Sequence, residues 1–563
     1  MRKRAVVLNT VICFGFFVVA MRLADIMILN HDRLYAKARM QQLKGEDVRV
    51  RRGVIFDRQG RELAVNLDLE SLYCDPAEVN APQKSALELS AATGRPSGVM
   101  LAKLSSGGHF VWLERKLEPD TVRRIKDAKI SGIGFVPDAK RVYPKGSVAS
   151  QVLGFVNVDN KGIDGVELKY DKYLSTGGGK VLLTRDASGK TLSQGVNMES
   201  VGNNLVLTID EWMQYTAEDE LDRVMSESRA RAATVIVMDP STGEILAMAN
   251  RPSFNPNSPA ESKTSERRDR AITDCYEPGS TFKIVIGTAA LEEGIVSPGS
   301  KFDCSRGLIE IGKRIVHDDH RHGVLTFEEV IQKSSNVGSI MIGMKLGKDR
   351  IYKYAKALGF GEKTGIDLPG EVSGLIRPPE RWSGVSIGSV PIGQEVAVTP
   401  LQVLRAYCAV ANGGLLVTPH VVSRIVSPDG HDLWTADYRP ERVLSRKTAE
   451  TFRDILKTVT EEGGTAKGAA VDGNNVAGKT GTAQMVDPAT KRYSRDKYVS
   501  SFVGFVPADN PKIAMIVVVY EPKGQHYGGL VAAPVFKRIA EKALSYLEVP
   551  RDDGYKNTLV VAR

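Results

Sequence analysis

Three short motifs in this sequence carry residues that together could perform acyl transfer through a serine. Ser280 and Lys283 stand three residues apart, and Ser334-Ser335-Asn336 and Lys479-Thr480-Gly481 follow downstream. A serine hydroxyl needs a base within hydrogen-bond reach to act as a nucleophile. A lysine in a dry cleft can supply that base, because burial disfavours the ammonium form. The pattern therefore predicts covalent catalysis by Ser280, with Lys283 as its base.

The residues around Ser280 favour a helix that would hold this pair on one face. Pro278 and Gly279 are typical of a helix start, Gly294 is typical of a helix end, and residues 284–293 contain few helix breakers. Side chains three positions apart on a helix lie on the same face. The N-terminus of the helix would also favour negative charge near Ser280.

Ser-x-x-Lys alone is a weak signal, because an exposed serine and lysine on a helical turn produce it by chance. The two later motifs change that interpretation, since Ser-x-x-Lys, Ser-x-Asn and Lys-Thr-Gly in this order are typical of penicillin-binding proteins and serine β-lactamases. We therefore take Ser280, Lys283, Ser334, Asn336 and Lys479 as candidate catalytic residues.

Length and composition indicate a globular protein of several domains. The chain has 563 residues, of which 42% are hydrophobic and 25% are charged, and these values exclude wholesale disorder. The net charge of +9 is spread along the chain, and no basic run interleaves with aromatic residues. Nucleic-acid binding is therefore not predicted.

The N-terminus is predicted to be a membrane anchor. Three cations at 2–4 precede an uncharged run over 5–21, and a mostly apolar continuation reaches residue 29. The run is near the lower limit for a membrane span, and the cations place the N-terminus in the cytoplasm. A buried helix or a cleaved signal peptide would give a similar pattern, but no convincing cleavage site follows. We predict a cytoplasmic tail at 1–4, a transmembrane anchor at 5–29 and an exported remainder.

The five cysteines give no disulfide framework, because they are widely scattered and form no Cys-x-x-Cys pair. We predict that they are buried free thiols.

Residues 30–200 show no grouping of nucleophile, base and orienting residue. The stretch 51–64 alternates apolar residues and turns at Gln59-Gly60, which predicts two short strands. Its arginines could bind phosphate, but a solvated edge or an ion pair at a domain interface is the simpler interpretation. We predict a non-catalytic pedestal, a mixed α+β domain that serves as a spacer or docking platform.

Residues 201–550 have the element order of an α/β sandwich. A short strand is expected at 205–209, and helices are expected over 211–228 and 533–547. Five further strands are predicted at 234–238, 244–249, 476–484, 498–506 and 512–520. These five would form one sheet between helices, with the Ser280 helix between the layers and Lys479 on an edge strand. Residues 551–563 are left as a C-terminal tail.

On these motifs the sequence resembles the class B penicillin-binding proteins, monofunctional D,D-transpeptidases of peptidoglycan synthesis, over nearly its whole length. Glu277-Pro278-Gly279-Ser280 is similar to the cell-division branch, the FtsI-type enzymes, whereas the elongation branch usually has Pro in place of the Glu. Further similar segments are Gly393-Gln394, Thr399-Pro400-Leu401-Gln402, Ala411-Asn412-Gly413-Gly414, Glu462-Gly463-Gly464-Thr465-Ala466, Gly478 to Gln484 and Tyr527-Gly528-Gly529. Cys275 is a local departure from the family pattern.

The resemblance implies the fold of the penicillin-binding serine transpeptidases. This is a five-stranded antiparallel sheet between helices, preceded by a mixed α+β pedestal domain and one N-terminal transmembrane helix. It implies that Ser280 attacks the penultimate D-Ala carbonyl of a stem pentapeptide and that Lys283 takes the hydroxyl proton. Ser334 would relay a proton to the leaving amine, Lys479 would supply positive charge, and Asn336 would hold the substrate amide and orient Lys283.

The same resemblance implies the substrate-binding groups. The backbone N–H groups of Ser280 and Thr482 would form the oxyanion hole, and the hydroxyls of Thr480 and Thr482 would bind the terminal carboxylate. Gly481 would leave room for the substrate along the strand.

The resemblance also implies the setting of the enzyme. Its expected partners are peptidoglycan stem pentapeptides, β-lactam antibiotics, the membrane through the N-terminal helix, an FtsW-type glycosyltransferase and other divisome proteins. No cofactor is expected. The expected location is the cytoplasmic membrane, single-pass, with the catalytic domain on the periplasmic or extracytoplasmic side during septal synthesis. An elongation-type class B transpeptidase and a membrane-anchored β-lactamase or β-lactam sensor remain alternatives.

One loop contains zinc-type ligands. It runs from His317 to His322 and includes Asp318, Asp319 and His320, with Cys304 upstream. Ligands this close in a loop usually cannot all face one ion, so we predict a polar loop and no metal.

Overall fold

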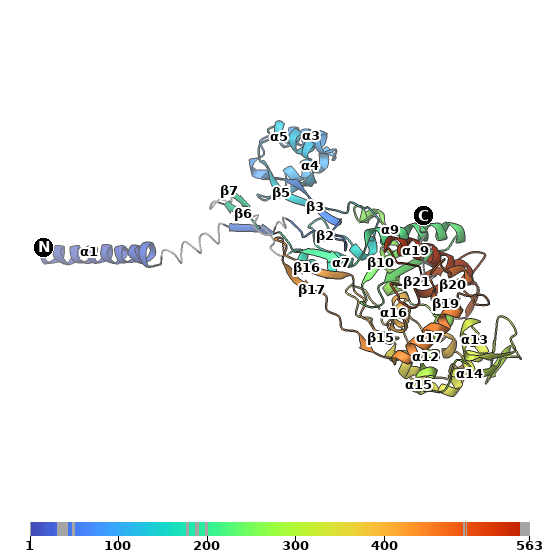
Figure 1. Cartoon of the computed structure of the whole chain (residues 1–563). Helices are drawn as coiled ribbons and strands as arrows, with labels where there is room; N and C mark the ends of the chain where they lie inside the picture. Colours follow the sequence, from blue (N-terminus) through green and yellow to red (C-terminus); the bar gives the residue numbers. More distant parts are fainter. Residues whose placement is uncertain are drawn as a thin grey trace, which may run out of the picture. The chain divides into compact units, whose positions relative to one another are not determined.

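The computed structural model describes residues 2–30, 43–47, 51–175, 180–185, 191–196, 201–487, 490 and 492–551. The chain divides into two compact units (Figure 1). The first unit comprises Met1–Arg52, Asn66–Lys140 and Ser175–Gly202, and the second comprises Gly53–Val65, Arg141–Leu174 and Asn203–Arg563.

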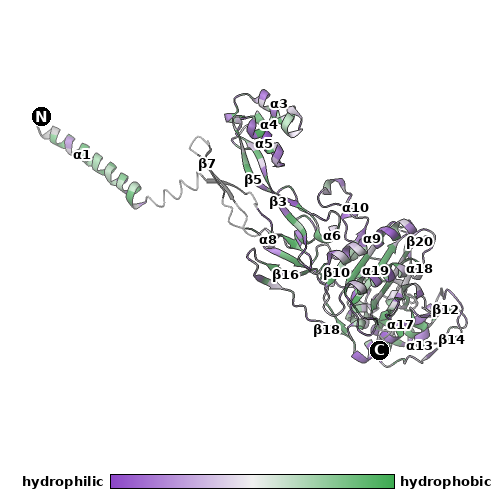
Figure 2. Ribbon diagram, turned by 45° about the horizontal axis from the view of Figure 1, so that its top comes forward, coloured by the Kyte–Doolittle hydropathy of each residue, from purple (hydrophilic) through white to green (hydrophobic). Residues whose placement is uncertain are grey.

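The chain begins with the apolar helix α1 (Arg2–Ala24), continued by a π-helical turn at Asp25–Leu29. The helical stretch Val6–Ile28 is long and apolar enough to cross a membrane. Figure 2 shows α1 as hydrophobic along most of its length. Because none of this apolar surface is buried within the protein, the helix is consistent with the predicted single-pass anchor.

In the first unit, three helices cover one face of a small sheet (Figure 1). The sheet consists of β4 (Val111–Leu117), β5 (Ile133–Val142) and the later part of β3 (Glu62–Cys74). Leu72, Cys74 and Leu113 of the strands pack in one core with the apolar side chains of the helices. These helices are α3 (Pro82–Thr93), α4 (Ser97–Leu104) and α5 (Pro119–Asp127). A separate sheet joins β1 (Leu43–Asp47), β6 (Lys180–Arg185) and β7 (Thr191–Val196).

The second unit is built on the predicted five-stranded antiparallel sheet, with strand order β10-β9-β21-β20-β19. The strands are β9 (Ala232–Met238), β10 (Ile245–Arg251), β19 (Ala477–Val486), β20 (Tyr493–Val506) and β21 (Ile513–Tyr520). Every residue of β9 and β21 is buried, as expected for strands covered on both faces. Strand β19, which carries Lys479, lies at one edge of the sheet.

Helices cover both faces of this sheet (Figure 1). Helices α9 (Glu211–Ser228) and α19 (Ala533–Tyr546) pack together on one face, and α16 (Pro400–Ala411) packs against β20 and β21. Helix α12 (Lys283–Glu292) contacts three further helices. These are α14 (Asn336–Leu346), α15 (Lys348–Ala357) and α17 (Arg446–Thr458).

The remaining elements of the second unit are short. A second group of strands joins β17 (Asp432–Thr435), β16 (Val422–Val426), β8 (Asn204–Leu207), β2 (Ile55–Phe56) and the start of β3. Two short strand pairs are β11 (Lys301–Asp303) with β14 (Val324–Thr326), and β12 (Leu308–Ile311) with β13 (Arg314–His317). The short helices include α6 (Ser150–Leu153), α7 (Gly165–Lys169), α8 (Asp171–Leu174), α10 (Thr264–Arg267), α11 (Arg270–Thr273), α13 (Phe327–Gln332) and α18 (Gly528–Val531).

A buried ion pair lies in the second unit. The Arg141 Nε donates to Glu167 Oε1 at 2.7 Å, and an Arg141 Nη1 donates to the carbonyl of Gly53 at 2.8 Å. The side chains of Arg141 and Glu167 are 1% and 0% exposed. Arg141 thus ties the end of β5 to α7 and to the chain just ahead of β2.

All five cysteines are free. Cys74, Cys304 and Cys408 are buried, which confirms the prediction, whereas Cys13 and Cys275 are exposed and the prediction is wrong for them. Cys13 lies in the apolar helix α1, which no protein core covers.

Candidate active site

Ser280 lies in a tight turn that leads directly into α12. The turn is a 3₁₀-helix at Gly279–Phe282, so the first turn of the predicted helix is wound more tightly than an α-helix. The Gly279 N–H donates to the carbonyl of Gly393 at 3.2 Å. A Cβ on Gly393 would lie 2.1 Å from the Gly279 carbonyl oxygen, and Gly393 has a φ of 77°. Only glycine permits this approach, so the loop at 393 fixes the turn that presents Ser280.

The Lys283 side chain is completely buried and points at the Ser-x-Asn motif. Its Nζ donates to the Ser334 carbonyl at 2.6 Å, the Ser334 Oγ at 3.2 Å, the Ser335 carbonyl at 3.2 Å and the Asn336 Oδ1 at 3.1 Å. Burial lowers the pKa of Lys283 to about 7, although Asp318 and Asp319 act in the opposite direction. A pKa near neutrality suits a residue that must accept a proton.

Ser334 occupies a backbone position that usually belongs to glycine. It follows the C-cap residue of α13 and has a φ of +59°. The Ser334 N–H donates to the Ile331 carbonyl at 3.2 Å, and the Ser335 N–H donates to the Val330 carbonyl at 3.0 Å. These two bonds form a Schellman motif, in which the left-handed residue is most often Gly. A serine there is strained, and in this conformation its hydroxyl lies 3.2 Å from the Lys283 Nζ.

The loop from His317 to His322, which was predicted to be polar, supports the Ser-x-Asn motif. Asp318 accepts hydrogen bonds from the Ser335 Oγ at 2.8 Å and from the N–H groups of Asn336 at 2.5 Å and Val337 at 3.0 Å, at the N-terminus of α14. The Asn336 amide donates to the His317 carbonyl at 3.1 Å. Among the described residues, no three His, Cys, Asp or Glu side chains converge as metal ligands would. The loop therefore positions Ser335 and Asn336 through hydrogen bonds.

Lys479 is the second buried lysine of the site. It is 1% exposed, and its Nζ lies 3.4 Å from the carbonyl and from the hydroxyl of Thr480. Burial, and then the charge of Lys283, lower the pKa of Lys479 well below its ordinary value. Among the described residues, neither Lys283 nor Lys479 forms an ion pair with a carboxylate.

The rest of the Lys-Thr-Gly strand lies against the nucleophile turn. A Cβ on Gly481 would lie 3.0 Å from the Pro278 carbonyl oxygen and 2.4 Å from the Ser501 Oγ. Gly481 is therefore required for packing of the turn on the strand, a constraint that the predicted role in substrate binding did not include. The Thr480 hydroxyl bonds that of Thr465 at 2.9 Å, and the Thr482 hydroxyl accepts from the Gly528 N–H at 3.0 Å.

The edge of β19 turns backbone groups toward Ser280. A Cβ on Gly279 would lie 3.2 Å from the Thr482 carbonyl oxygen, so the backbone of Thr482 faces the turn. In an antiparallel strand the N–H and C=O of one residue point to the same side. The Thr482 N–H therefore also faces the nucleophile turn, where an oxyanion can accept from it.

The structure brings Lys283, Ser334 and Asn336 into direct contact and places Lys479 to Thr482 beside the turn that carries Ser280. Among the described residues, the Ser280 Oγ has no hydrogen bond, and Lys283 instead bonds the Ser-x-Asn motif. Catalytic hydrogen bonds are often long in the absence of substrate. The arrangement can deliver a proton between Ser280, Lys283 and Ser334 beside an edge strand that can hold a peptide.

A cluster at the end of the cleft was missed in the sequence. Glu277 accepts from the Tyr493 hydroxyl at 2.9 Å and from the Glu395 N–H at 2.9 Å. Burial raises the pKa of Glu277, and the bonds from Glu395 and Tyr493 oppose this shift. The contact joins residues more than 200 positions apart, so no local pattern could have indicated it.

The fold and the site together define a serine acyl-transferase. Its features are the five-stranded sheet, Ser280 and Lys283 at the start of a buried helix, a Ser-x-Asn turn that faces them and a Lys-Thr-Gly edge strand. Two family models match the chain. The penicillin-binding protein transpeptidase domain matches residues 233–541, and the penicillin-binding protein dimerisation domain matches residues 47–207.

Individual proteins are similar over most of the chain. A probable peptidoglycan D,D-transpeptidase, PenA of Neisseria meningitidis, is 34% identical, and the match covers 88% of this chain and 85% of PenA. The peptidoglycan D,D-transpeptidase FtsI of Escherichia coli is 33% identical, and the match covers 96% of this chain and 92% of FtsI. The crystal structure of penicillin-binding protein 3 of Mycobacterium tuberculosis, complexed with aztreonam, superimposes with a TM-score of 0.70 at 29% identity, covering 90% of this chain and 98% of that one.

The chain belongs to the class B penicillin-binding proteins, which combine a dimerisation domain with a transpeptidase domain. It is a serine-type peptidoglycan D,D-transpeptidase. The predicted fold class is confirmed.

Proposed function

We propose that this transpeptidase cross-links stem peptides during septal cell-wall synthesis, through an acyl-enzyme on Ser280. The observation that carries the proposal is the convergence of the buried Lys283 Nζ on Ser334 and Asn336, at 3.2 Å and 3.1 Å, beside the nucleophile turn. This geometry gives a base and a proton relay in one water-poor cleft, as acyl transfer requires.

The reaction follows from the positions of these groups. Ser280 Oγ attacks the carbonyl of the penultimate D-Ala, and its proton passes to neutral Lys283. The tetrahedral oxyanion accepts from the N–H groups of Ser280 and Thr482. As the C–N bond breaks, Ser334 gives a proton to the leaving D-Ala amine and regains one from Lys283. The amine of a second stem then attacks the ester, loses a proton to the same relay and forms the cross-link, which releases Ser280.

Substrate recognition rests on the edge strand and on Lys479. The buried Lys479 supplies positive potential beside Thr480, and the Thr480 and Thr482 hydroxyls are the predicted partners of the terminal carboxylate. Solved relatives are complexed with aztreonam and ampicillin. By the same chemistry we expect β-lactams to acylate Ser280 here.

The septal role and the partners are supported by Glu277 in Glu-Pro-Gly-Ser, as in the cell-division branch, and by the similarity to FtsI. We propose an FtsW-type glycosyltransferase and other divisome proteins as partners, and a catalytic domain held on the extracytoplasmic side by α1. A fluorescent fusion in the native host should gather at the division site. Labelling only along the side wall would favour the elongation-type role instead.

Intact-mass measurement after exposure to benzylpenicillin tests the core of the proposal. The adduct should map to Ser280, persist for many minutes and be absent from Ser280→Ala. Rapid, repeated nitrocefin turnover would place the protein among the β-lactamases. An equal adduct on Ser280→Ala would refute the nucleophile.

A further inference from the structure

The second unit contains a small cavity outside the active site, lined by charged side chains of both signs. It has a volume of about 190 Å³, and its lining includes Asp164, Arg267, Asp269 and Thr273 together with Leu368 and Pro369. Asp269 caps the short helix α11, which leads into the segment 274–279 ahead of Ser280. None of these residues takes part in the acyl transfer described above.

Asp269, which lines this cavity, has one buried carboxylate oxygen without a hydrogen-bond partner among the described residues. The residue is 9% exposed, and its Oδ1 accepts from the Asn250 amide at 3.0 Å and from the Ala271 N–H at 3.1 Å. Its Oδ2 is buried and has no hydrogen-bond partner among the described residues. A buried acceptor without a donor is costly, so the free oxygen calls for a donor from outside the fold.

A second lining residue has the opposite need. The Nε of Arg267 is buried and has no acceptor among the described residues. Its guanidinium lies 5.7 Å from the ring centre of Phe155, and one terminal nitrogen makes a long contact of 3.5 Å with the Thr264 hydroxyl. Asp164, whose Oδ1 accepts from the Gly165 N–H at 2.9 Å, adds a second carboxyl group to the lining. The lining of one cavity of about 190 Å³ therefore includes two carboxyl groups and a guanidinium group.

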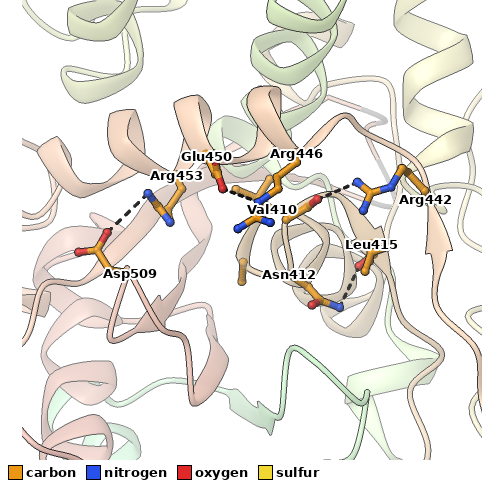
Figure 3. A pocket seen from close by; sticks show the side chains of 10 residues that line it. Val410, Asn412, Leu415, Arg442, Arg446, Glu450, Arg453 and Asp509 are labelled. Carbon is orange, nitrogen blue, oxygen red and sulfur yellow. Dashed lines mark hydrogen bonds and ion pairs between the residues drawn. The ribbon is translucent and has the colours of Figure 1, made fainter.

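A different cavity shows what a self-satisfied charged pocket looks like (Figure 3). It has a volume of about 280 Å³ and is lined by Arg442, Arg446 and Arg453. There Arg446 pairs with Glu450 at 2.7 Å, Arg453 pairs with Asp509 at 3.6 Å, and Arg442 donates to the Gly413 carbonyl at 2.9 Å. Because the protein supplies these partners itself, that cavity carries no comparable demand for a ligand.

We propose that the cavity at Asp269, which we call the Asp269 pocket, binds a small free α-amino acid. The ammonium group would donate to Asp269 Oδ2 and to the carboxylate of Asp164, and the carboxylate would accept from Arg267 Nε–H. A lone cation would leave the Arg267 donor unpaired, and a lone anion would leave Asp269 unpaired. The α-amino acid is the smallest ligand that carries both charges, and the volume limits its side chain to a short one.

The reaction of this enzyme supplies one such ligand. Each acylation of Ser280 releases a free D-alanine, so the product itself can fill the pocket. This identification of the source rests on the proposed function, whereas the chemical class of the ligand rests on the pocket alone. The two are tested separately by measuring binding without turnover.

The test is isothermal titration calorimetry of D-alanine and glycine into the full chain in detergent. Ser280 is first acylated with benzylpenicillin, so that the catalytic cleft is closed; Ser280→Ala replaces the acylated protein if no adduct forms. We expect saturable binding of one amino acid per chain. Propionate and ethylamine, which each lack one of the two charges, should bind at least about tenfold more weakly.

Two variants localise the binding. Asp269→Asn keeps the Oδ1 contacts with Asn250 and Ala271, and Arg267→Gln removes the guanidinium; each should lower the affinity at least about tenfold. Glu450→Gln, in the cavity of Figure 3, is the matched control and should bind as the wild type does. Melting temperatures of the variants show that they fold, and the rate of benzylpenicillin acylation by Asp269→Asn should be unchanged.

Several results would overturn the proposal. These are the absence of saturable binding, equal affinity in Asp269→Asn and wild type, or a crystal soaked with D-alanine that holds only water at Asp269. Binding that survives both variants but disappears when Ser280 is acylated would assign the ligand to the catalytic cleft instead.

Discussion

Two regions of the second unit bury cations, and they do so in opposite ways. Arg141 is 1% exposed and is paired with the equally buried Glu167 at 2.7 Å. Lys283 and Lys479 are also buried, but their hydrogen bonds go to neutral oxygens, and burial lowers the pKa of both. A buried ion pair between an arginine and a carboxylate fixes a structure. A buried cation without a carboxylate gives up its proton readily, which suits Lys283 as the proposed base. Once Lys283 is neutral, its charge no longer lowers the pKa of Lys479, so Lys479 can stay positive beside Thr480.

The first prediction concerns Lys283→Met. Acylation by a fluorescent penicillin should slow about a thousandfold, because the side chain that accepts the Ser280 proton is gone. The melting temperature should change little, since the lost hydrogen bonds are offset by removal of a buried amine. Stopped-flow labelling and thermal unfolding measure the two effects. Acylation within tenfold of the wild-type rate would show that another residue activates Ser280.

Glu167→Gln should have the opposite effect, a large loss of stability with little change in activity. Removing one partner leaves Arg141 charged and buried, and such a change costs about 3–5 kcal/mol of the free energy of unfolding. The fraction that remains folded should acylate at the normal rate. Chemical denaturation provides the measurement. Glu450→Gln breaks the exposed pair with Arg446 and is the matched control, with an expected loss below about 1 kcal/mol. Equal losses of unfolding free energy in the two variants would contradict the structural role assigned to the buried pair.

Ser334→Gly separates stability from chemistry within the cleft. Glycine relieves the left-handed strain at a φ of +59°, so the unfolding free energy should rise by about 1 kcal/mol. The hydroxyl 3.2 Å from Lys283 Nζ is lost, so acylation should fall about a hundredfold. Ser334→Ala should lose the same activity without the gain in stability. A less stable glycine variant would contradict the strain argument.

The helices and strands could be predicted from local sequence patterns, whereas the side-chain contacts around Ser280 could be predicted only in part. Helix α9 was predicted at 211–228 and lies at Glu211–Ser228, because its caps and periodicity are local. Strand β19 was predicted on an edge and is there. The strain at Ser334 could not be predicted, since Ser rarely takes the left-handed position after a helix.

The supporting contacts escaped prediction for a different reason. Asp318 was predicted to lie in a polar loop without a metal, and no pattern in the sequence indicated that its carboxylate accepts hydrogen bonds at the start of α14. Arg141 and Glu167 lie in the region predicted to be a spacer, and their pairing could not be predicted because it depends on the path of the chain between them. Such contacts form only in the tertiary structure and produce no periodic pattern in the sequence.

The pH dependence of acylation sharpens the assignment of Lys283. The base must be neutral, and its pKa is lowered to about 7 by burial. The rate should therefore fall about tenfold per pH unit below about pH 7 and level off above it. Asp318 raises the pKa of Lys283, so Asp318→Asn should move the midpoint of the profile to lower pH. A midpoint that moves upward in this variant would contradict the assigned base.

The smallest effect is expected at the far end of the cleft, where Tyr493 meets Glu277. The hydroxyl donates at 2.9 Å to a carboxylate that also accepts from the Glu395 N–H. The bond ties the start of β20 to the residue three positions before Ser280. Tyr493 is about one-third exposed, which limits the energy of this hydrogen bond. Tyr493→Phe should slow acylation only about threefold to tenfold, through placement of the nucleophile turn, and the pH midpoint should not move because Lys283 keeps its surroundings. Rates measured across pH for Tyr493→Phe and Asp318→Asn together decide this. A shifted midpoint in Tyr493→Phe would mean that Glu277 influences the pKa of Lys283. The Glu277–Tyr493 cluster would then take part in the chemistry and not only in the packing of the nucleophile turn.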